Sequence, residues 1–245
     1  MIFIIYLLII GAAEAITVYV NPIWGTVTHV AIFAALLIHS TLERRQANQH
    51  FLISLSLVPL VRIVSLAMPL ISVPRTWWYP IIYAPLLGAA IVVTRLLGYK
   101  REEVGLTFRF SWMQLIVGLT GLGLGLLEYL ILRPEPLINE LTWQSLWLPA
   151  LIFFVAVGFS EEYIFRGVLQ RTSSQVMGSW GIVYASAIFA LMHMGFYSWL
   201  DVVFVFGIAL FFGWAVKKTG SLFGVTLSHG FANIMLYLIA PFFLR

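Results

Sequence analysis

Long apolar stretches separated by short polar segments dominate this sequence. We expect helical spans at about residues 2–20, 27–42, 51–72, 77–97, 112–132, 146–171, 181–197, 202–216 and 222–243. Most of them approach the roughly 20 residues that a helix needs to cross a hydrocarbon core about 30 Å thick. Because the bilayer core holds no water, each backbone N–H and C=O must be paired within the protein, which favours helices. The pattern therefore predicts an all-α protein, a polytopic transmembrane helical bundle of about eight to nine spans.

The composition supports a membrane protein. Hydrophobic residues make up 61% of the 245, and charged residues only 10%, whereas charged residues are about 25% of an average soluble domain. So few charges could not cover the surface of a water-soluble protein of this size. The chain has no cysteine, which excludes disulfides, thiolate metal ligands and a cysteine nucleophile.

The charged residues outside the spans indicate an orientation. With the N-terminus in the cytoplasm, the inner side has more Lys and Arg than the outer side, as the positive-inside rule requires. The inner residues are Arg44, Arg45, Lys100, Arg101, Arg109, Arg171, Lys217 and Lys218, and the outer ones are Arg75, Arg133 and Arg245. We therefore expect a multi-pass membrane protein, with the bilayer and not nucleic acid as the partner of its basic residues. We place it in a prokaryotic plasma membrane, although the same charge bias suits a eukaryotic endoplasmic reticulum as well. The oligomeric state is not determined by this pattern.

Two smaller features concern the packing of the spans. Gly121 and Gly125 form a small-xxx-small pair that would let two helices approach closely. Arg62 lies inside an apolar span, where a charged side chain needs a partner, and Glu14 or Glu128 could provide it.

Strongly polar side chains interrupt the apolar sequence in its C-terminal part. They are Glu161, Glu162, Arg166, His193, His229 and Asn233. Ionisable groups inside a bilayer cost at least a few kcal/mol each, so by default they mark a functional interior. Counted at about 1.5 Å per residue from the expected inner turns, Glu161, His193 and His229 lie roughly 13–19 Å along three helices, and Asn233 lies one turn beyond His229. We therefore expect a carboxylate, two imidazoles and a carboxamide to meet at similar depth.

Two hydrolytic schemes fit this set of side chains. A carboxylate beside an imidazole can hold a water molecule and remove its proton, while His229 and Asn233 could stabilise the oxyanion that forms when a carbonyl is attacked. This scheme requires no cofactor. Alternatively, Glu161, His193 and His229 could bind zinc with one open position. The H-E-x-x-H metalloprotease sequence is absent, and the spacing alone does not decide between the schemes.

Three short motifs make the interpretation more specific. Residues 161–166 read EEYIFR, residues 189–193 read FALMH and residues 229–233 read HGFAN. They resemble the E-E-x-x-x-R, F-x-x-x-H and H-x-x-x-N motifs of the CAAX-protease and bacteriocin-processing (CPBP, or Abi) family, which includes the type II CAAX prenyl endopeptidases. All three occur in this order, on separate apolar stretches within about 75 residues. The resemblance covers roughly residues 146–243.

The resemblance implies a role for each residue of the motifs. Glu161 and His193 would activate the attacking water, and His229 and Asn233 would form the oxyanion site. The supporting residues would be Glu162, Arg166 and Phe189. The substrate would be a prenylated CAAX-type or hydrophobic peptide, and family members have been described both as metalloproteases and as metal-independent glutamate proteases.

The sequence thus predicts N-terminal transmembrane helices in residues 1–145 and an intramembrane protease core in residues 146–245. Two other functions stay open. A non-catalytic scaffold or bacteriocin-immunity factor could share the fold, although a pure scaffold has no need of the whole set of motif residues. A proton-coupled transporter also uses intramembrane carboxylates and histidines, but it would be expected to contain inverted repeats, and none is convincing here.

Overall fold

The computed structural model describes residues 2–107 and 111–244. Within these residues the protein is built from helices alone, as the sequence predicted. Arg109 and Arg245, which entered the expected charge distribution, lie outside the described residues.

The first part of the chain forms the helices that precede the motifs. They are α1 (Ile2–Ala15), η1 (Ile16–Val20), α2 (Pro22–Leu42), α3 (Gln46–Leu55), α4 (Leu57–Ala67), α5 (Arg75–Leu96), η2 (Arg101–Val104) and α6 (Trp112–Leu132). The helices of the motif-bearing part are α7 (Trp143–Ile152), η3 (Phe153–Phe159), α8 (Ser160–Glu162), η4 (Tyr163–Leu169), α9 (Gln170–Met177), α10 (Trp180–Leu191), η5 (Met192–Phe196), α11 (Trp199–Thr219), α12 (Phe223–Ile234), η6 (Met235–Ile239) and α13 (Ala240–Phe243).

Among residues 2–107 and 111–244, eight continuous helices are long and apolar enough to cross a membrane. They are Ile2–Val20, Pro22–Leu42, Gln46–Ala67, Arg75–Leu96, Trp112–Leu132, Trp143–Met177, Trp199–Thr219 and Phe223–Phe243. The remaining expected span corresponds to the shorter apolar helix Trp180–Phe196. Each expected span therefore matches one helix, and the prediction of a polytopic helical bundle is confirmed.

Some helix boundaries differ from the expected ones for a local reason. The second span begins at Pro22, earlier than expected, because the Asn21 side chain accepts a hydrogen bond of 2.8 Å from the backbone N–H of Ile23. Asparagine is a strong N-cap residue, and proline is favoured at the first helical position. The expected boundary followed hydrophobicity and did not include this cap.

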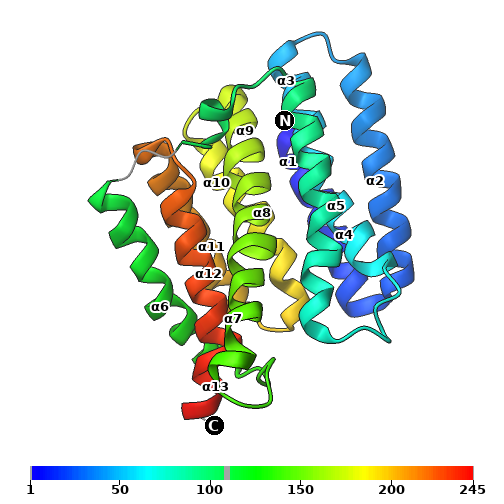
Figure 1. Ribbon diagram of the computed structural model, residues 1–245. Helices are drawn as coiled ribbons and strands as arrows, with labels where there is room; N and C mark the ends of the chain where they lie inside the picture. Colours follow the sequence, from blue (N-terminus) through cyan, green and yellow to red (C-terminus); the bar gives the residue numbers. More distant parts are fainter. Residues whose placement is uncertain (1, 108–110, 245) are drawn as a thin grey trace.

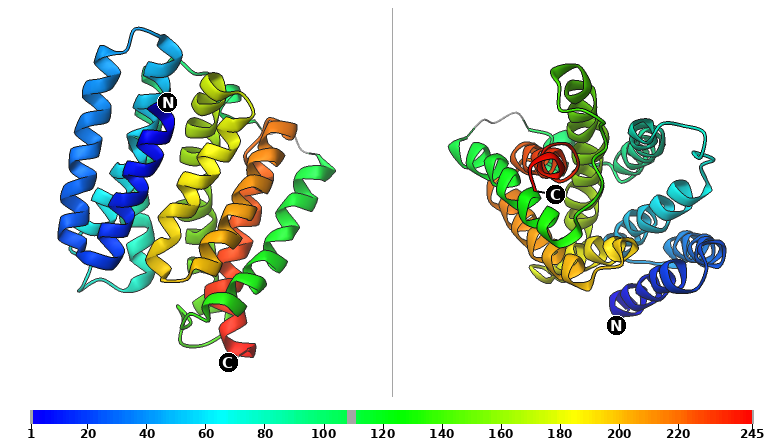
Figure 2. Two further views of the ribbon diagram at one scale, coloured as in Figure 1. Left: turned by 180° about the vertical axis from the view of Figure 1, so that it is seen from behind. Right: turned by 90° about the horizontal axis from the view of Figure 1, so that it is seen from below.

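The helices that precede the motifs lie on two opposite sides of the motif-bearing core (Figure 1). Helices α1–α5 lie together on one side, and α6 lies on the opposite side, packed against α12 (Figures 1 and 2). The core between them contains α7–α12, and α1, α3 and α5 are in contact with it. The proposed division at residue 145 therefore stays a prediction, because the helices before it surround the core on both sides.

The surface of the bundle is apolar. Large hydrophobic side chains point outward along several spans, including Leu8, Ile116 and Val203, which are each more than 60% exposed. An apolar surface of this extent is incompatible with water and matches the acyl chains of a bilayer. The protein is therefore an integral, multi-pass membrane protein whose partner over this surface is lipid.

Close packing of α6 against α12 depends on two glycines. A Cβ atom added to Gly121 would lie 2.0 Å from the backbone oxygen of Ser228, and one added to Gly125 would lie 2.2 Å from that of Ala232. Neither position can hold a larger residue at this helix separation. The small-xxx-small pair predicted from the sequence thus forms a helix contact, and its partner is the helix that carries His229 and Asn233.

Candidate active site

The helix that carries the adjacent glutamates is one continuous span, Trp143–Met177. Within it, the α-helical turn α8 stands between two π-helical segments, η3 and η4. π-Helical turns inside α-helices are frequent at functional sites, because they displace the side chains that follow from the positions of a regular helix. Here they bracket Glu161 and Glu162.

Helix α12 approaches this region closely because it has a glycine at the contact. A Cβ atom on Gly230 would lie 2.1 Å from the ring of Phe154, so only glycine fits there. On the facing helix, a Cβ on Gly158 would lie 3.2 Å from the Gly230 nitrogen. The neighbouring residue His229 is therefore brought against the two carboxylates.

A cavity of about 210 Å³ lies where these helices meet. The side chains of all the predicted catalytic residues line it, namely Glu161, His193, His229 and Asn233. Phe189, predicted as a supporting residue, lines it too. The convergence expected from the spacing of the motifs is thus present in the structure.

Glu161 is held at this cavity by contacts to both carboxylate oxygens. The hydroxyl of Tyr83 on α5 donates a hydrogen bond to Oε1 of Glu161. Oε2 lies 3.6 Å from Nε2 of His229, and the Glu161 side chain is 16% exposed. One side of the carboxylate is therefore fixed, while the other faces an imidazole across a gap.

Glu162 points away from the cavity and holds two other site residues. Its Oε1 accepts a hydrogen bond of 2.8 Å from Nδ1 of His229 and one of 3.1 Å from Arg166. Glu162 is fully buried and Arg166 is 4% exposed. Because a buried charge requires a partner, the pair is stable only as a unit, and it orients the His229 ring.

Phe189 packs against the Arg166 guanidinium and against both histidines. The Arg166 Cζ lies 4.2 Å from the centre of the Phe189 ring, within the range of a cation–π contact. The same ring lies 4.9 Å from the ring of His193 and 6.3 Å from that of His229, centre to centre. This phenylalanine therefore packs against both imidazoles, which restricts their rotation.

His193 and Asn233 complete the lining of the cavity. Nδ1 of His193 lies 3.0 Å from the backbone oxygen of Phe189, so Nδ1–H donates and Nε2 keeps a free lone pair. Asn233 follows His229 by one turn of α12, and its buried Nδ2 has no hydrogen-bond partner among the described residues. A buried amide donor without a partner is costly, and this one belongs to a residue that lines the cavity.

The three residues expected to bind zinc in the alternative scheme, Glu161, His193 and His229, line this same cavity. In the described part of the chain, no three His, Cys, Asp or Glu side chains are placed to hold one metal ion. Nδ1 of His229 lies 2.8 Å from Glu162 and its Nε2 lies 3.6 Å from Glu161, and a histidine that binds zinc commonly gives its other ring nitrogen to a carboxylate in this way. The zinc scheme and the glutamate scheme both stay predictions.

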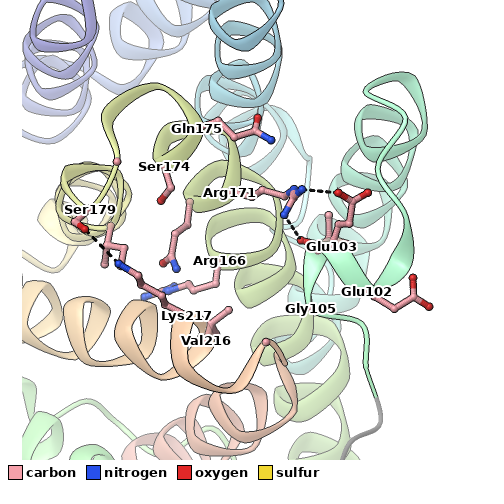
Figure 3. A pocket seen from close by; sticks show the side chains of 15 residues that line it. Glu102, Glu103, Gly105, Arg166, Arg171, Ser174, Gln175, Ser179, Val216 and Lys217 are labelled. Atoms are coloured by element: carbon pink, nitrogen blue, oxygen red, sulfur yellow. Dashed lines mark hydrogen bonds and ion pairs between the residues drawn. The ribbon is translucent and has the colours of Figure 1, made fainter.

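Arg166 also borders a second, larger cavity of about 580 Å³ (Figure 3). None of the other predicted site residues lines it. Its most prominent polar feature is the ion pair between Arg171 and Glu103 (Figure 3). We therefore assign the candidate site to the smaller cavity, where the acid, the imidazoles and the amide meet.

Two contributions to the site were missed or left open by the sequence. Tyr83 was not singled out, because it lies inside an apolar span and belongs to none of the three motifs. Arg62, whose partner was open, pairs with Glu14 through contacts of 2.7–2.8 Å, and it also lines the cavity. The first part of the chain thus contributes side chains that the motifs do not contain.

Comparisons with known proteins agree with these observations. Residues 143–235 match the family described as type II CAAX prenyl endopeptidase Rce1-like. The chain is also similar to the Uncharacterized protein YpbD of Bacillus subtilis (strain 168), with 35% identity over 94 residues, which covers 38% of this chain and 46% of that protein. The similarity thus spans less than half of that relative, and no solved structure matches the chain. Residues 143–235, which contain all three motifs, are thus similar to the type II CAAX prenyl endopeptidase (Rce1-like) family.

Proposed function

We propose that this protein is an intramembrane endopeptidase that hydrolyses a peptide bond with a water molecule activated by Glu161 and His193. The observation that carries the proposal is the cavity in which a carboxylate, two imidazoles and an unpartnered carboxamide converge inside a membrane protein. The family match of residues 143–235 supports the same reaction class.

The first step is the activation of water between Glu161 and His193. The lone pair on Nε2 of His193 orients the water, and the Glu161 carboxylate accepts its proton as the oxygen attacks the substrate carbonyl carbon. The hydrogen bond from Tyr83 holds Glu161 in place. When the C–N bond then breaks, the proton on Glu161 passes to the leaving amine, and both products are released.

The developing oxyanion is stabilised by His229 and Asn233. We assign His229 the doubly protonated form, because each of its ring nitrogens faces a carboxylate oxygen. Nδ1–H donates to Glu162, which leaves Nε2–H as a donor toward the cavity. The unpartnered Nδ2 of Asn233 supplies a second donor. Donors that are already in place where charge develops stabilise the transition state without reorganisation.

We further propose that the substrate is a prenylated CAAX-type or other hydrophobic peptide, and that the protein resides in a prokaryotic plasma membrane with its N-terminus in the cytoplasm. The turns between α2 and α3, α5 and η2, and α11 and α12 lie at one end of the bundle (Figure 1). These turns and the helix ends beside them carry six basic residues, which supports this orientation under the positive-inside rule; they are Arg44, Arg45, Lys100, Arg101, Lys217 and Lys218.

The proposal is tested with purified protein in detergent and a quenched fluorescent farnesylated CAAX peptide, beside the same peptide without the lipid. We expect cleavage of the farnesylated peptide, with a product mass that identifies one scissile bond. A metal chelator is expected to leave the rate unchanged, and inhibition by the chelator would instead support the zinc scheme. Failure to cleave either peptide or a membrane-extracted peptide library would favour a non-catalytic scaffold.

A further inference from the structure

An ion pair from the N-terminal helices reaches the turn that contains His193. Arg62 on α4 donates from Nε to both oxygens of the Glu14 carboxylate on α1, at 2.8 Å each. Its NH2 group lies 2.7 Å from the same carboxylate and also donates to the backbone oxygen of Met192. Met192 directly precedes His193. A side chain 130 residues away in the sequence is thus bound to the peptide unit that links Met192 and His193.

The contact has a clear physical role at this position. Helix α10 ends at Leu191, and His193 stands in the short 3-10 turn η5 that follows. Carbonyl groups at the end of a helix lack partners further along it, and they take donors from elsewhere. A guanidinium there also interacts favourably with the negative end of the helix dipole. Arg62 therefore fixes the orientation of the peptide plane at the start of the His193 turn.

Arg62 is itself held by a fully buried acid. The Glu14 side chain is 0% exposed, and Nε2 of His29 lies 3.4 Å from its Oε1. A carboxylate that is buried and contacted from two helices cannot move without a large electrostatic cost. The packing of α1, α2 and α4 therefore determines, through Arg62, where the Met192 carbonyl lies.

We propose that Glu14 and Arg62 form a positioning pair that sets the geometry of His193, so that the N-terminal helices complete an active site whose motifs all lie in residues 143–235. This inference rests on the proposed hydrolytic function. Neither residue needs to touch the reacting atoms, since both act through the backbone at Met192. Arg62 lines the cavity, and 17% of its side chain is exposed. A small cation in the cavity can therefore reach the position that the guanidinium of Arg62 occupies.

The chain offers a matched control for the effect of losing an ion pair. Arg171 on α9 pairs with the Glu103 carboxylate and also donates to a backbone oxygen, that of Glu103, at 3.2 Å. Like the Arg62 contacts, these contacts join the N-terminal part of the chain to the core (Figure 3). They lie at the larger cavity and not at the His193 turn. Arg171→Ala should therefore show how much the activity changes when an ion pair between these two parts of the chain is lost away from the His193 turn.

The experiment compares Arg62→Ala, Arg62→Lys, Glu14→Gln and Arg171→Ala in kcat, in KM and in hydrogen exchange of residues 192–196. For Arg62→Ala we expect kcat to fall by roughly 10²-fold, the size expected from a misplacement of about 1 Å, with KM changed by less than about threefold. Added guanidinium should restore at least about a tenth of the lost rate, because it can occupy the vacated site beside Glu14. Residues 192–196 should exchange faster, while Arg171→Ala should match the wild type within about threefold.

The inference is overturned if folded Arg62→Ala has the kcat of Arg171→Ala, or if its activity loss is not rescued and the faster exchange spreads over all the N-terminal helices. A wild-type protein that cleaves no peptide would instead refute the proposed function. The exchange measurement still decides the positioning role in that case. Unchanged protection of residues 192–196 in Arg62→Ala would show that the pair does not order the turn.

Discussion

Replacing Gly121 by alanine should damage both the stability and the activity of the protein. The added Cβ would meet the Ser228 backbone oxygen at 2.0 Å, so α6 and α12 must separate by more than about 1 Å to restore normal contact. Overpacking of this kind costs roughly 1–3 kcal/mol. A shift of about 1 Å at Ser228 also displaces its neighbour His229, and misplacement on that scale can reduce catalysis by about 10²-fold.

Gly123→Ala is the matched control for this experiment. It lies on the same helix, and its added Cβ would meet nothing within 4 Å. Because alanine favours a helix over glycine by about 1 kcal/mol, the control should be as stable as the wild type or slightly more so. Thermal unfolding in detergent and the rate of peptide cleavage measure the two effects. Equal unfolding temperatures and equal rates for Gly121→Ala and Gly123→Ala would refute the proposed role of the glycine contact.

Three further changes test individual contacts of the site. Tyr83→Phe removes the hydroxyl that holds Glu161, and loss of a hydrogen bond to a charged group should lower kcat by about 10–100-fold; an unchanged kcat would contradict the role of Tyr83. Asn233→Ala should lower kcat by about 10²–10³-fold with little change in KM, and a change confined to KM would show that the amide binds the ground state instead. Arg166→Met removes one of the two cations that contact the buried Glu162, which should destabilise the protein by about 1–3 kcal/mol in chemical unfolding, whereas the double variant with Glu162→Gln should recover part of that loss.

The fold could be predicted because the spans follow from local properties. Apolar stretches of sufficient length determine where helices cross the bilayer, and each expected span has its helix. The predicted start of the second span, near residue 27, was wrong because an Asn-Pro cap at Asn21 and Pro22 begins the helix earlier. The sequence also identified Gly121 and Gly125 as a contact pair, since small residues allow close approach regardless of the partner helix.

The candidate site could be predicted only as far as the motifs extend. The spacing of His229 and Asn233 on one helix face, and the depth of Glu161 and His193, follow from helix geometry alone. Tyr83 could not be found in this way, because its contact with Glu161 depends on how α5 packs against the core. Periodicity describes the face of one helix, and it carries no information about which distant helix covers that face.

The same reasoning explains why the partner of an intramembrane charge was harder to assign. The sequence offers both Glu14 and Glu128 as partners for Arg62. Only the arrangement of α1 and α4 in the fold selects Glu14. The contact from Arg62 to Met192 was not anticipated at all, because a backbone oxygen has no signature in the sequence.

The most direct test of the central claim is the rate at which purified Glu161→Ala protein cleaves the farnesylated CAAX peptide, relative to the wild type. Its unfolding temperature in detergent should stay close to that of the wild type, which shows that the bundle is intact. Hydrolysis by a Glu161-activated water requires that the wild type cleaves the peptide and that the folded variant does not. Cleavage at the wild-type rate by folded Glu161→Ala protein would contradict the proposed mechanism.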